Sequence, residues 1–257
     1  MKIDTKKCSI GIELGSTRIK AVLINEKFKV VASGIHNREN KFINGFWTYS
    51  YDEIVFGLRN AFKNLRFNFY DKYLEKLTNV GSVGISAMMH GYLVLDENDK
   101  PLVPFRTWRN NNAEVAAEKL SQKFNFNIPA RWSVAHLYQA ILTKEEHVKK
   151  IKKITTLAGY IHYLLTGNFV LGIGDASGIF PIDTSTKNYD LNKLKIFNNE
   201  LKKEKIPFQL EEILPKVLMA GEIGGKLTKK GIDILDPEGD LTEGILFCAP
   251  EGDASTG

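Results

Sequence analysis

Three short apolar stretches near the N-terminus alternate with polar turns, and this pattern restricts the fold more than any other feature of the chain. The stretches Ser9–Glu13, Ile19–Asn25 and Lys29–His36 predict β-strands, because they are rich in apolar and β-branched residues. The connections between them hold only a few residues, and connections this short join neighbouring antiparallel strands. We therefore expect the fold to begin with a β-meander.

Helical and strand-like patterns alternate in the rest of the chain. From Tyr51 to Leu77, apolar residues recur at the spacing of one helical face, which predicts a long amphipathic helix after the strands. The other expected elements are strands at Val80–Ile85, Tyr92–Asp96 and Ile245–Ala249, and helices at Ala113–Phe124, Val134–Val148 and Thr156–Leu165, the last closed by Gly167. This order predicts an α/β fold with a mixed β-sheet flanked by helices.

The composition is that of a globular protein and argues against several function classes. Of the 257 residues, 43% are hydrophobic and 25% are charged, which excludes a disordered or fibrous chain. No apolar run approaches the ~18 residues that cross a bilayer, so we expect a cytoplasmic protein without a membrane partner. The formal charge of +5 comes with lysines in helix-like stretches such as Lys144–Lys153 and Leu191–Lys205. Solvated helix faces explain these lysines better than a nucleic-acid partner, because no nucleic-acid motif accompanies them.

The two cysteines, Cys8 and Cys248, each lie in an apolar run that predicts a strand. Neither has Cys or His neighbours at the spacing of a metal site. We interpret both as thiols of the core rather than as a disulfide.

The turn after the first strand carries groups that handle phosphate. Gly15 lets the backbone turn tightly, Ser16 and Thr17 offer hydroxyl and amide donors, Glu13 is a candidate Mg²⁺ ligand, directly or through water, and Lys20 adds a cation. The alternative is an ordinary hairpin turn. The sequence is not a P-loop, because the second glycine and the Lys-Ser/Thr pair are not in place. A phosphate loop that joins two β-strands instead favours the actin-like (ribonuclease H-like) ATPase fold.

A second polar segment interrupts the apolar path after Val80–Ile85. A neutral imidazole at His90 can exchange hydrogen bonds with a sugar hydroxyl, and Met89 can cover a carbon face of the sugar. A single histidine at a strand end also serves a purely structural role in many proteins. We therefore treat Met89 and His90 as candidate sugar-binding residues whose context decides their role.

A third segment combines a large aromatic side chain with forked and amide donors. Trp108 can cover sugar C–H surfaces, while Arg109 and Asn110 can pair with adjacent hydroxyl groups. The alternative is a helix start in which Asn112 is the N-cap of Ala113–Phe124. Both interpretations hold together, since they use different residues.

The chain closes with a carboxylate in a glycine-containing turn. Phosphorylation of an alcohol requires an acceptor for the hydroxyl proton, and Asp253 after Gly252 can supply it. An isolated Gly-Asp pair is otherwise a common turn. The turn follows the expected strand Ile245–Ala249 and leads to nothing further, so we expect that a longer parent protein has been cut.

These segments, in this order, resemble the FGGY family of carbohydrate kinases, particularly the branch that includes xylulose kinase and other ketose kinases. The resemblance extends from about Cys8 to Gly257. Its motifs are Gly11–Thr17, Met89–Gly91, Trp108–Asn110, Gly174–Gly178 and Ala249–Asp253. No single motif suffices, but their order over nearly the whole chain makes the resemblance specific.

The resemblance implies two actin-like domains with ATP, Mg²⁺ and sugar in the cleft between them. Residues 1–257 resemble the first domain alone, and most adenosine contacts would come from the absent second half. The loop Gly15–Thr17 would face the ATP phosphates, Met89 and His90 would touch the sugar, and Asp253 would be the general base. A homodimer is compatible with the resemblance.

The sequence departs from the family pattern at three places. Glu13 stands where the family usually has Asp, and Trp108–Asn112 replaces the Trp-x-Asp-x-Arg common in xylulose kinases. Glu251 stands where the family often has glycine. Its charge beside the transferred phosphoryl group would be unfavourable unless a metal or lysine paired with it.

Three functions are compatible with these residues. The leading hypothesis is ATP-dependent phosphorylation of a ketopentose, ketohexose or related polyol by the full-length parent. An actin-like ATPase switch uses the same fold, although Met89-His90 and Trp108-Arg109 argue against it. A degenerate kinase that binds sugar without phosphorylating it would fit the altered residues Glu13, Asn110 and Glu251.

The 257-residue chain alone is expected to fold but not to phosphorylate a sugar, because half of the nucleotide cleft is missing from it. A coupled assay of ADP release with a panel of ketoses and polyols measures this directly. Sugar-dependent ADP release by the fragment would contradict the prediction.

Overall fold

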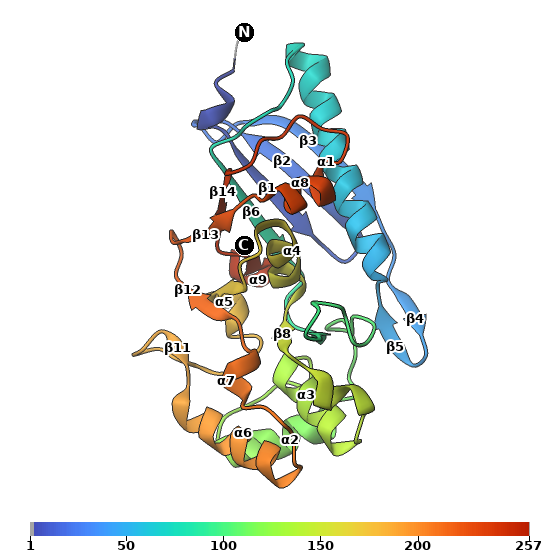
Figure 1. Ribbon diagram of the computed structural model, residues 1–257, viewed down its shortest axis with the longest axis vertical. Helices are drawn as coiled ribbons and strands as arrows, with labels where there is room; N and C mark the ends of the chain where they lie inside the picture. Colours follow the sequence, from blue (N-terminus) through green and yellow to red (C-terminus); the bar gives the residue numbers. More distant parts are fainter. Residues whose placement is uncertain (1–2, 257) are drawn as a thin grey trace.

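Strand β6 (Ser82–Ala87) lies inside the main sheet and pairs in parallel with three other strands. Its partner on one side is β1 (Ser9–Leu14), and its partners on the other are β14 (Leu246–Cys248) and β15 (Glu251–Gly252). The computed structural model describes residues 3–256 (Figure 1). The first and last segments of the chain thus meet at one central strand.

The remaining strands of the main sheet are antiparallel to their neighbours. β2 (Arg18–Ile24) and β3 (Val30–Asn37) continue the sheet beyond β1, and β13 (Ile223–Lys226) lies at the other edge beside β14. Among the described residues the sheet has seven strands in the order β13-β14-β6-β1-β2-β3, with β15 beside the end of β6. The meander and the mixed sheet expected from the sequence are confirmed.

Several two-stranded sheets connect the helices outside the main sheet. These pairs are β4 (Lys41–Ile43) with β5 (Phe46–Thr48), β7 (Leu93–Leu95) with β8 (Lys153–Thr155), β9 (Val170–Gly172) with β12 (Lys216–Leu218), and β10 (Ile182–Asp183) with β11 (Asn188–Tyr189). All but the β9–β12 pair are antiparallel.

The helices range from single turns to one long rod. They are α1 (Tyr51–Tyr73), α2 (Glu114–Phe124), α3 (Ser133–Leu142), α4 (Leu157–Thr166), α5 (Ile173–Ala176), α6 (Leu191–Lys203), α7 (Leu210–Ile213), α8 (Lys229–Leu235) and α9 (Asp253–Thr256), with 3₁₀ turns η1 (Thr5–Lys7) and η2 (Glu146–Lys150). Figure 1 shows α1 along the main sheet and α2, α3, α6 and α7 gathered at the opposite end of the molecule. Within residues 3–256, no helix combines the length and the apolar character needed to cross a bilayer.

Helix α1 covers one face of the main sheet. Ser50 and Glu53 form a capping box that fixes its N-terminus. Its inward face is apolar and buried, and comprises Ile54, Leu58, Ala61, Phe62, Leu65 and Phe69. Gly34 of β3 permits the close approach, because a Cβ there would lie 2.1 Å from the Ala61 carbonyl oxygen. The helix and the meander are therefore packed backbone against backbone.

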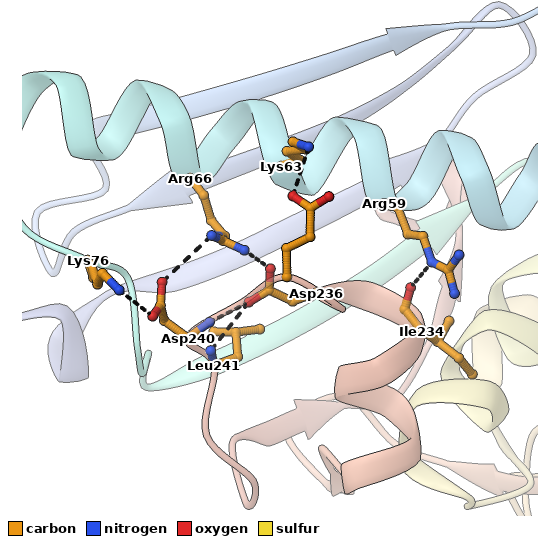
Figure 2. Close-up of polar contacts among 9 residues, drawn as sticks. Arg59, Lys63, Arg66, Lys76, Ile234, Asp236, Asp240 and Leu241 are labelled. Carbon is orange, nitrogen blue, oxygen red and sulfur yellow. Dashed lines mark hydrogen bonds and ion pairs between the residues drawn. The ribbon is translucent and has the colours of Figure 1, made fainter.

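Polar contacts tie α1 to the segment 233–241, which precedes β14 (Figure 2). Arg66 forms an ion pair with the buried carboxylate of Asp236, which also accepts two backbone amides of the following turn at 3.1 and 3.3 Å. Arg59 donates to the Ile234 carbonyl at 2.6 Å. The other ion pairs of this set are Arg66–Asp240 and Lys63–Glu238, together with Lys76–Asp240 from just beyond α1. These contacts hold segment 233–241 against α1, so that the strands β14 and β15 that follow it can pair with β6.

The described apolar side chains form two cores. One lies between the main sheet, α1 and α4, and the other lies among α2, α3 and α6. The loops after β6 and the short helix α5 lie between the two cores (Figure 1). The candidate site is built at this junction.

Two expected helices end earlier than their apolar patterns suggest. The helix expected to reach Leu77 ends at Tyr73, where Leu74 adopts a left-handed conformation with φ 54°. The helix expected over Val134–Val148 is wrong as a single element, because α3 ends at Leu142 and Lys144 has φ 56°. A left-handed residue breaks the helical hydrogen-bond pattern even when the apolar spacing continues across it.

Some of the other local predictions are confirmed and some are wrong. Gly167 closes α4 with φ 74°, as predicted, while Thr156, expected as the first helical residue, is the N-cap. Asn112 is not the N-cap of α2, since Ala113 holds that position without a side-chain hydrogen bond. Both cysteines are free thiols, but only Cys8 is buried; the expectation of a core thiol is wrong for Cys248, which points away from the packed face of β14.

Replacing Gly34 with alanine is expected to destabilise the chain by roughly 1–3 kcal/mol, because the new methyl group would overpack the α1–β3 contact. Gly11→Ala is the matched control, since a Cβ on that strand glycine meets nothing within 4 Å. Urea unfolding of the two variants measures the difference. Equal stability of both variants would contradict the packing described for α1.

Candidate active site

Three loops meet at the edge of the main sheet where the parallel strands end. They follow β1, β6 and β15 and carry Gly15–Thr17, Met89-His90 and Asp253. Glu13 of β1 and Glu251 of β15 both lie opposite Ser86 of β6, so the three strands finish level with one another. Ligands of α/β proteins bind at such carboxyl ends. The structure therefore brings together three segments that are far apart in the sequence.

The loop Gly15–Thr17 is fixed through its carbonyl groups. The Arg38 guanidinium donates to the Gly15 oxygen at 2.9 and 2.6 Å, and the Tyr49 hydroxyl donates to the Ser16 oxygen at 2.5 Å. The Arg38 amide donates to the Thr17 oxygen at 2.9 Å. In a trans peptide, the carbonyl and the following N–H point in opposite directions. The Ser16 and Thr17 amides consequently point away from this brace, and in the described part of the chain neither donates a hydrogen bond.

Arg38 and Tyr49 support this loop, and the sequence did not reveal them. The Arg38 guanidinium lies 4.2 Å from the centre of the Tyr49 ring. Burial lowers the pKa of Arg38 to about 10, so it remains a cation at neutral pH. Neither residue belongs to a local motif with the loop, and only the β3 register brings Arg38 beside it.

The face of the sheet next to this loop is open and carries two acids and one base. Glu13 and Lys20 are cross-strand neighbours on β1 and β2. They line a cavity of about 410 Å³ together with Gly11, Gly84 and Glu251. Within residues 3–256, no group of three or more His, Cys, Asp or Glu side chains is arranged to hold a metal. Mg²⁺ is commonly bound by one or two carboxylates together with water and phosphate oxygens, and Glu13 offers such a carboxylate.

The segment after β6 places Met89 and His90 beside Asp253. The Met89 amide donates to Oδ1 of Asp253 at 3.2 Å. The His90 ring stacks on Trp132 at 6.4 Å between centroids, and its Nδ1 lies 3.5 Å from the Gly178 carbonyl oxygen. Burial is the main cause that lowers the pKa of His90, which makes its imidazole neutral at pH 7. Trp132 is a third residue, after Arg38 and Tyr49, that the sequence did not reveal.

The segment Trp108–Asn110 has a divided role. The Asn110 side chain accepts the Trp47 amide and donates to the Trp47 and Thr107 carbonyls, all at 2.9 Å. Two of these contacts hold strand β5, and the third holds the Thr107 backbone beside it. Trp108 is exposed, and the Arg109 guanidinium lies 5.6 Å from the Trp108 ring and 5.9 Å from the Trp47 ring.

This segment runs alongside the loop that carries His90. The Tyr92 amide donates to the Arg106 carbonyl at 2.8 Å, and the Arg106 amide returns the contact at 3.2 Å. Within residues 3–256, no side-chain hydrogen bond joins Trp108 or Arg109 to His90. Their use in binding a sugar stays a prediction.

A buried carboxyl group lies beneath the edge of the sheet that carries the candidate site. Asp175 of α5 is fully buried, and its Oδ2 accepts the Thr156 hydroxyl at 2.5 Å. Burial raises the pKa of Asp175 to about 8, and the charges of Glu251 and Asp253 add to the rise. Asp175 is therefore neutral at pH 7. The sequence motif Gly174–Gly178 contains this residue but gave no sign of its burial.

Glu251 lies next to Asp175, and its charge is not left unpaired. Its carboxylate accepts the amides of Gly174 and Asp175 at 3.3 and 2.8 Å and the Ser255 hydroxyl at 3.1 Å. The expectation that only a metal or a lysine would offset this charge is wrong, because the first turn of α5 does so.

Solved structures with the same arrangement of elements are sugar and glycerol kinases of the actin-like (ribonuclease H-like) class. A xylulose kinase from Rhodospirillum rubrum superposes with a TM-score of 0.75 at 17% identity, covering 96% of this chain and 49% of that one. A glycerol kinase from Plasmodium falciparum, solved with ADP, superposes with a TM-score of 0.77 at 18% identity, covering 100% and 50%. At these identities the comparison establishes the fold, which is the actin-like fold expected from the sequence.

The chain belongs to the FGGY family of carbohydrate kinases, since residues 8–236 match the family's N-terminal domain. It is 28% identical to the xylulose kinase of Haemophilus influenzae over 151 residues, which are 55% of this chain and 29% of that protein. It is 27% identical to the gluconokinase of Bacillus subtilis over 204 residues, or 73% and 37%. The chain thus spans less than half the length of these relatives.

Asp175→Asn is expected to become more stable relative to the wild type as the pH rises from about 4 to about 8. The unfolded carboxyl ionises near pH 4 while the folded one stays protonated, so the wild type loses stability over this window. The amide that replaces the carboxyl group does not titrate, so the variant avoids that loss. Thermal unfolding of both proteins at several pH values measures the difference.

The groups facing Asp175, namely Glu251, Asp253 and Tyr189, are the same in both proteins. They therefore cancel in the difference between wild type and variant. A stability difference that does not change between pH 4 and pH 8 would contradict the assignment of a neutral Asp175.

Proposed function

We propose that residues 1–257 form the N-terminal domain of a cytoplasmic sugar kinase that transfers the γ-phosphoryl group of ATP to a hydroxyl of a ketopentose, ketohexose or related polyol. The single observation that carries the proposal is the position of Asp253. Its carboxylate lies beside the Met89-His90 segment, at the edge where three parallel strands end and where the loop Gly15–Thr17 also begins. The names of the relatives, which include xylulose kinase, gluconokinase and rhamnulokinase, point to the same class of reaction.

Asp253 is the proposed general base. Its Oδ1 accepts the amides of Met89 and Ala254 at 3.2 and 2.9 Å, which fixes the orientation of the carboxylate. Its Oδ2 accepts no hydrogen bond from the described residues and is free to receive a proton. The sugar oxygen attacks the γ-phosphorus, its proton passes to Oδ2, and ADP leaves as the new phosphate ester forms.

Met89 and His90 are the proposed sugar contacts. A neutral imidazole held between Trp132 and the Gly178 carbonyl can exchange hydrogen bonds with a hydroxyl group. Because His90 and Asp253 leave neighbouring strand ends, one bound sugar can reach both residues. Trp108, Arg109 and Asn110 would line the same side, with Asn110 acting through the position of β5.

The loop Gly15–Thr17 is the proposed contact for the ATP phosphates. The amides of Ser16 and Thr17 point away from Arg38 and Tyr49 and lack acceptors among the described residues, which suits a phosphate oxygen. Glu13 would hold Mg²⁺ through water, and Lys20 would add a positive charge beside it. The metal would neutralise charge on the phosphates and so ease the attack of the hydroxyl.

The remaining nucleotide contacts would come from the part of the kinase that the relatives have beyond this domain. The chain covers 29% and 37% of the xylulose kinase and the gluconokinase named above. Closure of two domains on the substrates would exclude water from the transferred phosphoryl group.

Asp253→Asn in the complete gene product is expected to lower kcat by roughly 10²- to 10⁴-fold, the usual contribution of a general base. Binding of the sugar should persist, because the amide keeps an oxygen for the Met89 contact. A ketose screen by thermal shift measures binding, and ADP release measures turnover. Asp71→Asn is the control, since Asp71 is exposed near the C-terminal end of α1 and is not part of the candidate site.

Retained turnover in Asp253→Asn would contradict the assignment of the base. A wild-type protein whose ATP consumption no ketose or polyol accelerates would contradict sugar phosphorylation itself and favour an ATPase switch.

A further inference from the structure

The Glu251 carboxylate accepts hydrogen bonds from backbone amides in the first turn of α5. Oε1 accepts the Gly174 amide at 3.3 Å, and Oε2 accepts the Asp175 amide at 2.8 Å. Free amides at the start of a helix attract an acceptor, and α5 has no side-chain cap from its own N-cap residue, Gly172. The cap therefore comes from β15, which is 76 residues further along the chain.

The backbone around Glu251 has room for this carboxylate and for little else. A Cβ on Gly172 would lie 2.0 Å from Oε1, and a Cβ on Gly174 would lie 2.8 Å from Oε2. The same Cβ on Gly174 would lie 2.5 Å from Cβ of Ser255, whose hydroxyl donates to Oε2 at 3.1 Å. Two glycines thus form a cradle that any larger residue would close.

The cradle fixes the strand that carries Asp253. The Gly172 amide donates to the Pro250 carbonyl at 2.8 Å, so one backbone bond and the Glu251 carboxylate join α5 to β15. On its other side β15 pairs with the end of β6, with Gly252 opposite Ala87. Asp253 follows directly, and its Oδ1 meets the Met89 amide.

We propose that Glu251 is a positioning residue, which caps α5 in order to hold Asp253 at the Met89 amide with its second oxygen free. The proposal rests on the proposed role of Asp253 as the base. A glycine at position 251 would leave the α5 amides without this acceptor, so the proposal explains why an acid stands there. Loss of the carboxylate leaves the Gly172–Pro250 backbone hydrogen bond as the remaining link, in the described part of the chain, between the start of α5 and residues 250–252, so the direction of Asp253 is then less tightly fixed on that side.

The first experiment uses the 257-residue chain and measures amide hydrogen exchange by NMR. In Glu251→Ala, exchange at Gly174 and Asp175 should rise by roughly 10-fold, the effect of losing a charge-assisted hydrogen bond. Exchange at the Met89 amide should rise as well, because Asp253 is its acceptor. Glu251→Gln keeps one acceptor oxygen and should lie close to the wild type. Glu243→Ala is the control, as Glu243 is exposed in the preceding turn.

The second experiment uses the complete gene product and separates kcat from KM for the sugar. A misplaced base should lower kcat by roughly 10- to 100-fold in Glu251→Ala, with KM for the sugar changed by less than about 3-fold. Gly174→Ala should act in the same direction, because its methyl group displaces Glu251 without removing it. Recovery of kcat in Glu251→Gln would support positioning, which a general loss of folding would not produce.

Wild-type kcat and unchanged Met89 exchange in Glu251→Ala would overturn the proposal. If Glu251→Ala does not fold, Gly174→Ala and Glu251→Gln are compared instead. A lower kcat in Gly174→Ala beside a recovered kcat in Glu251→Gln supports the proposal, and wild-type kcat in both variants overturns it. If the wild-type protein phosphorylates no sugar, the proposed function fails, and the exchange at Met89 alone decides whether Glu251 positions Asp253.

Discussion

The parallel pairing of β6 with β1 and β15 is the constraint on which the rest of the structure depends. Because Ser86 lies opposite both Glu13 and Glu251, three strands from distant parts of the sequence end at one level. A slip of one residue in any pair would turn its side chains to the other face of the sheet. The α1 contacts with segment 233–241 support this register, since they bring the last strands back to β6 (Figure 2).

The candidate site is oriented mainly through backbone groups. Arg38 and Tyr49 hold the carbonyls of the phosphate-type loop, and the Met89 amide holds Asp253. Glu251 likewise holds backbone groups with its side chain, since its carboxylate accepts the amides of α5. Such contacts place reactive groups without occupying the atoms that chemistry needs, which leaves the Ser16 and Thr17 amides and Oδ2 of Asp253 available.

Local patterns predicted the elements that local forces determine. The meander, the face of α1 and the end of α4 at Gly167 follow from periodicity and turn chemistry in the sequence. The break at Lys144 did not, because an apolar pattern can continue across a left-handed residue. The site residues Arg38 and Trp132 and the pairing of Glu251 with α5 depend on contacts between distant segments, which no local window contains. The motifs that resemble the FGGY family indicated which segments form the candidate site, but not the contacts that support those segments.

The most direct test of the account is a crystal structure of the complete gene product with a bound ketose, Mg²⁺ and a non-hydrolysable ATP analogue. The account predicts one sugar hydroxyl within roughly 2.6–3.2 Å of Oδ2 of Asp253, in line with the γ-phosphate. It also predicts that the Ser16 and Thr17 amides donate to phosphate oxygens. A sugar bound away from Met89 and His90, or phosphates that do not reach this loop, would contradict it.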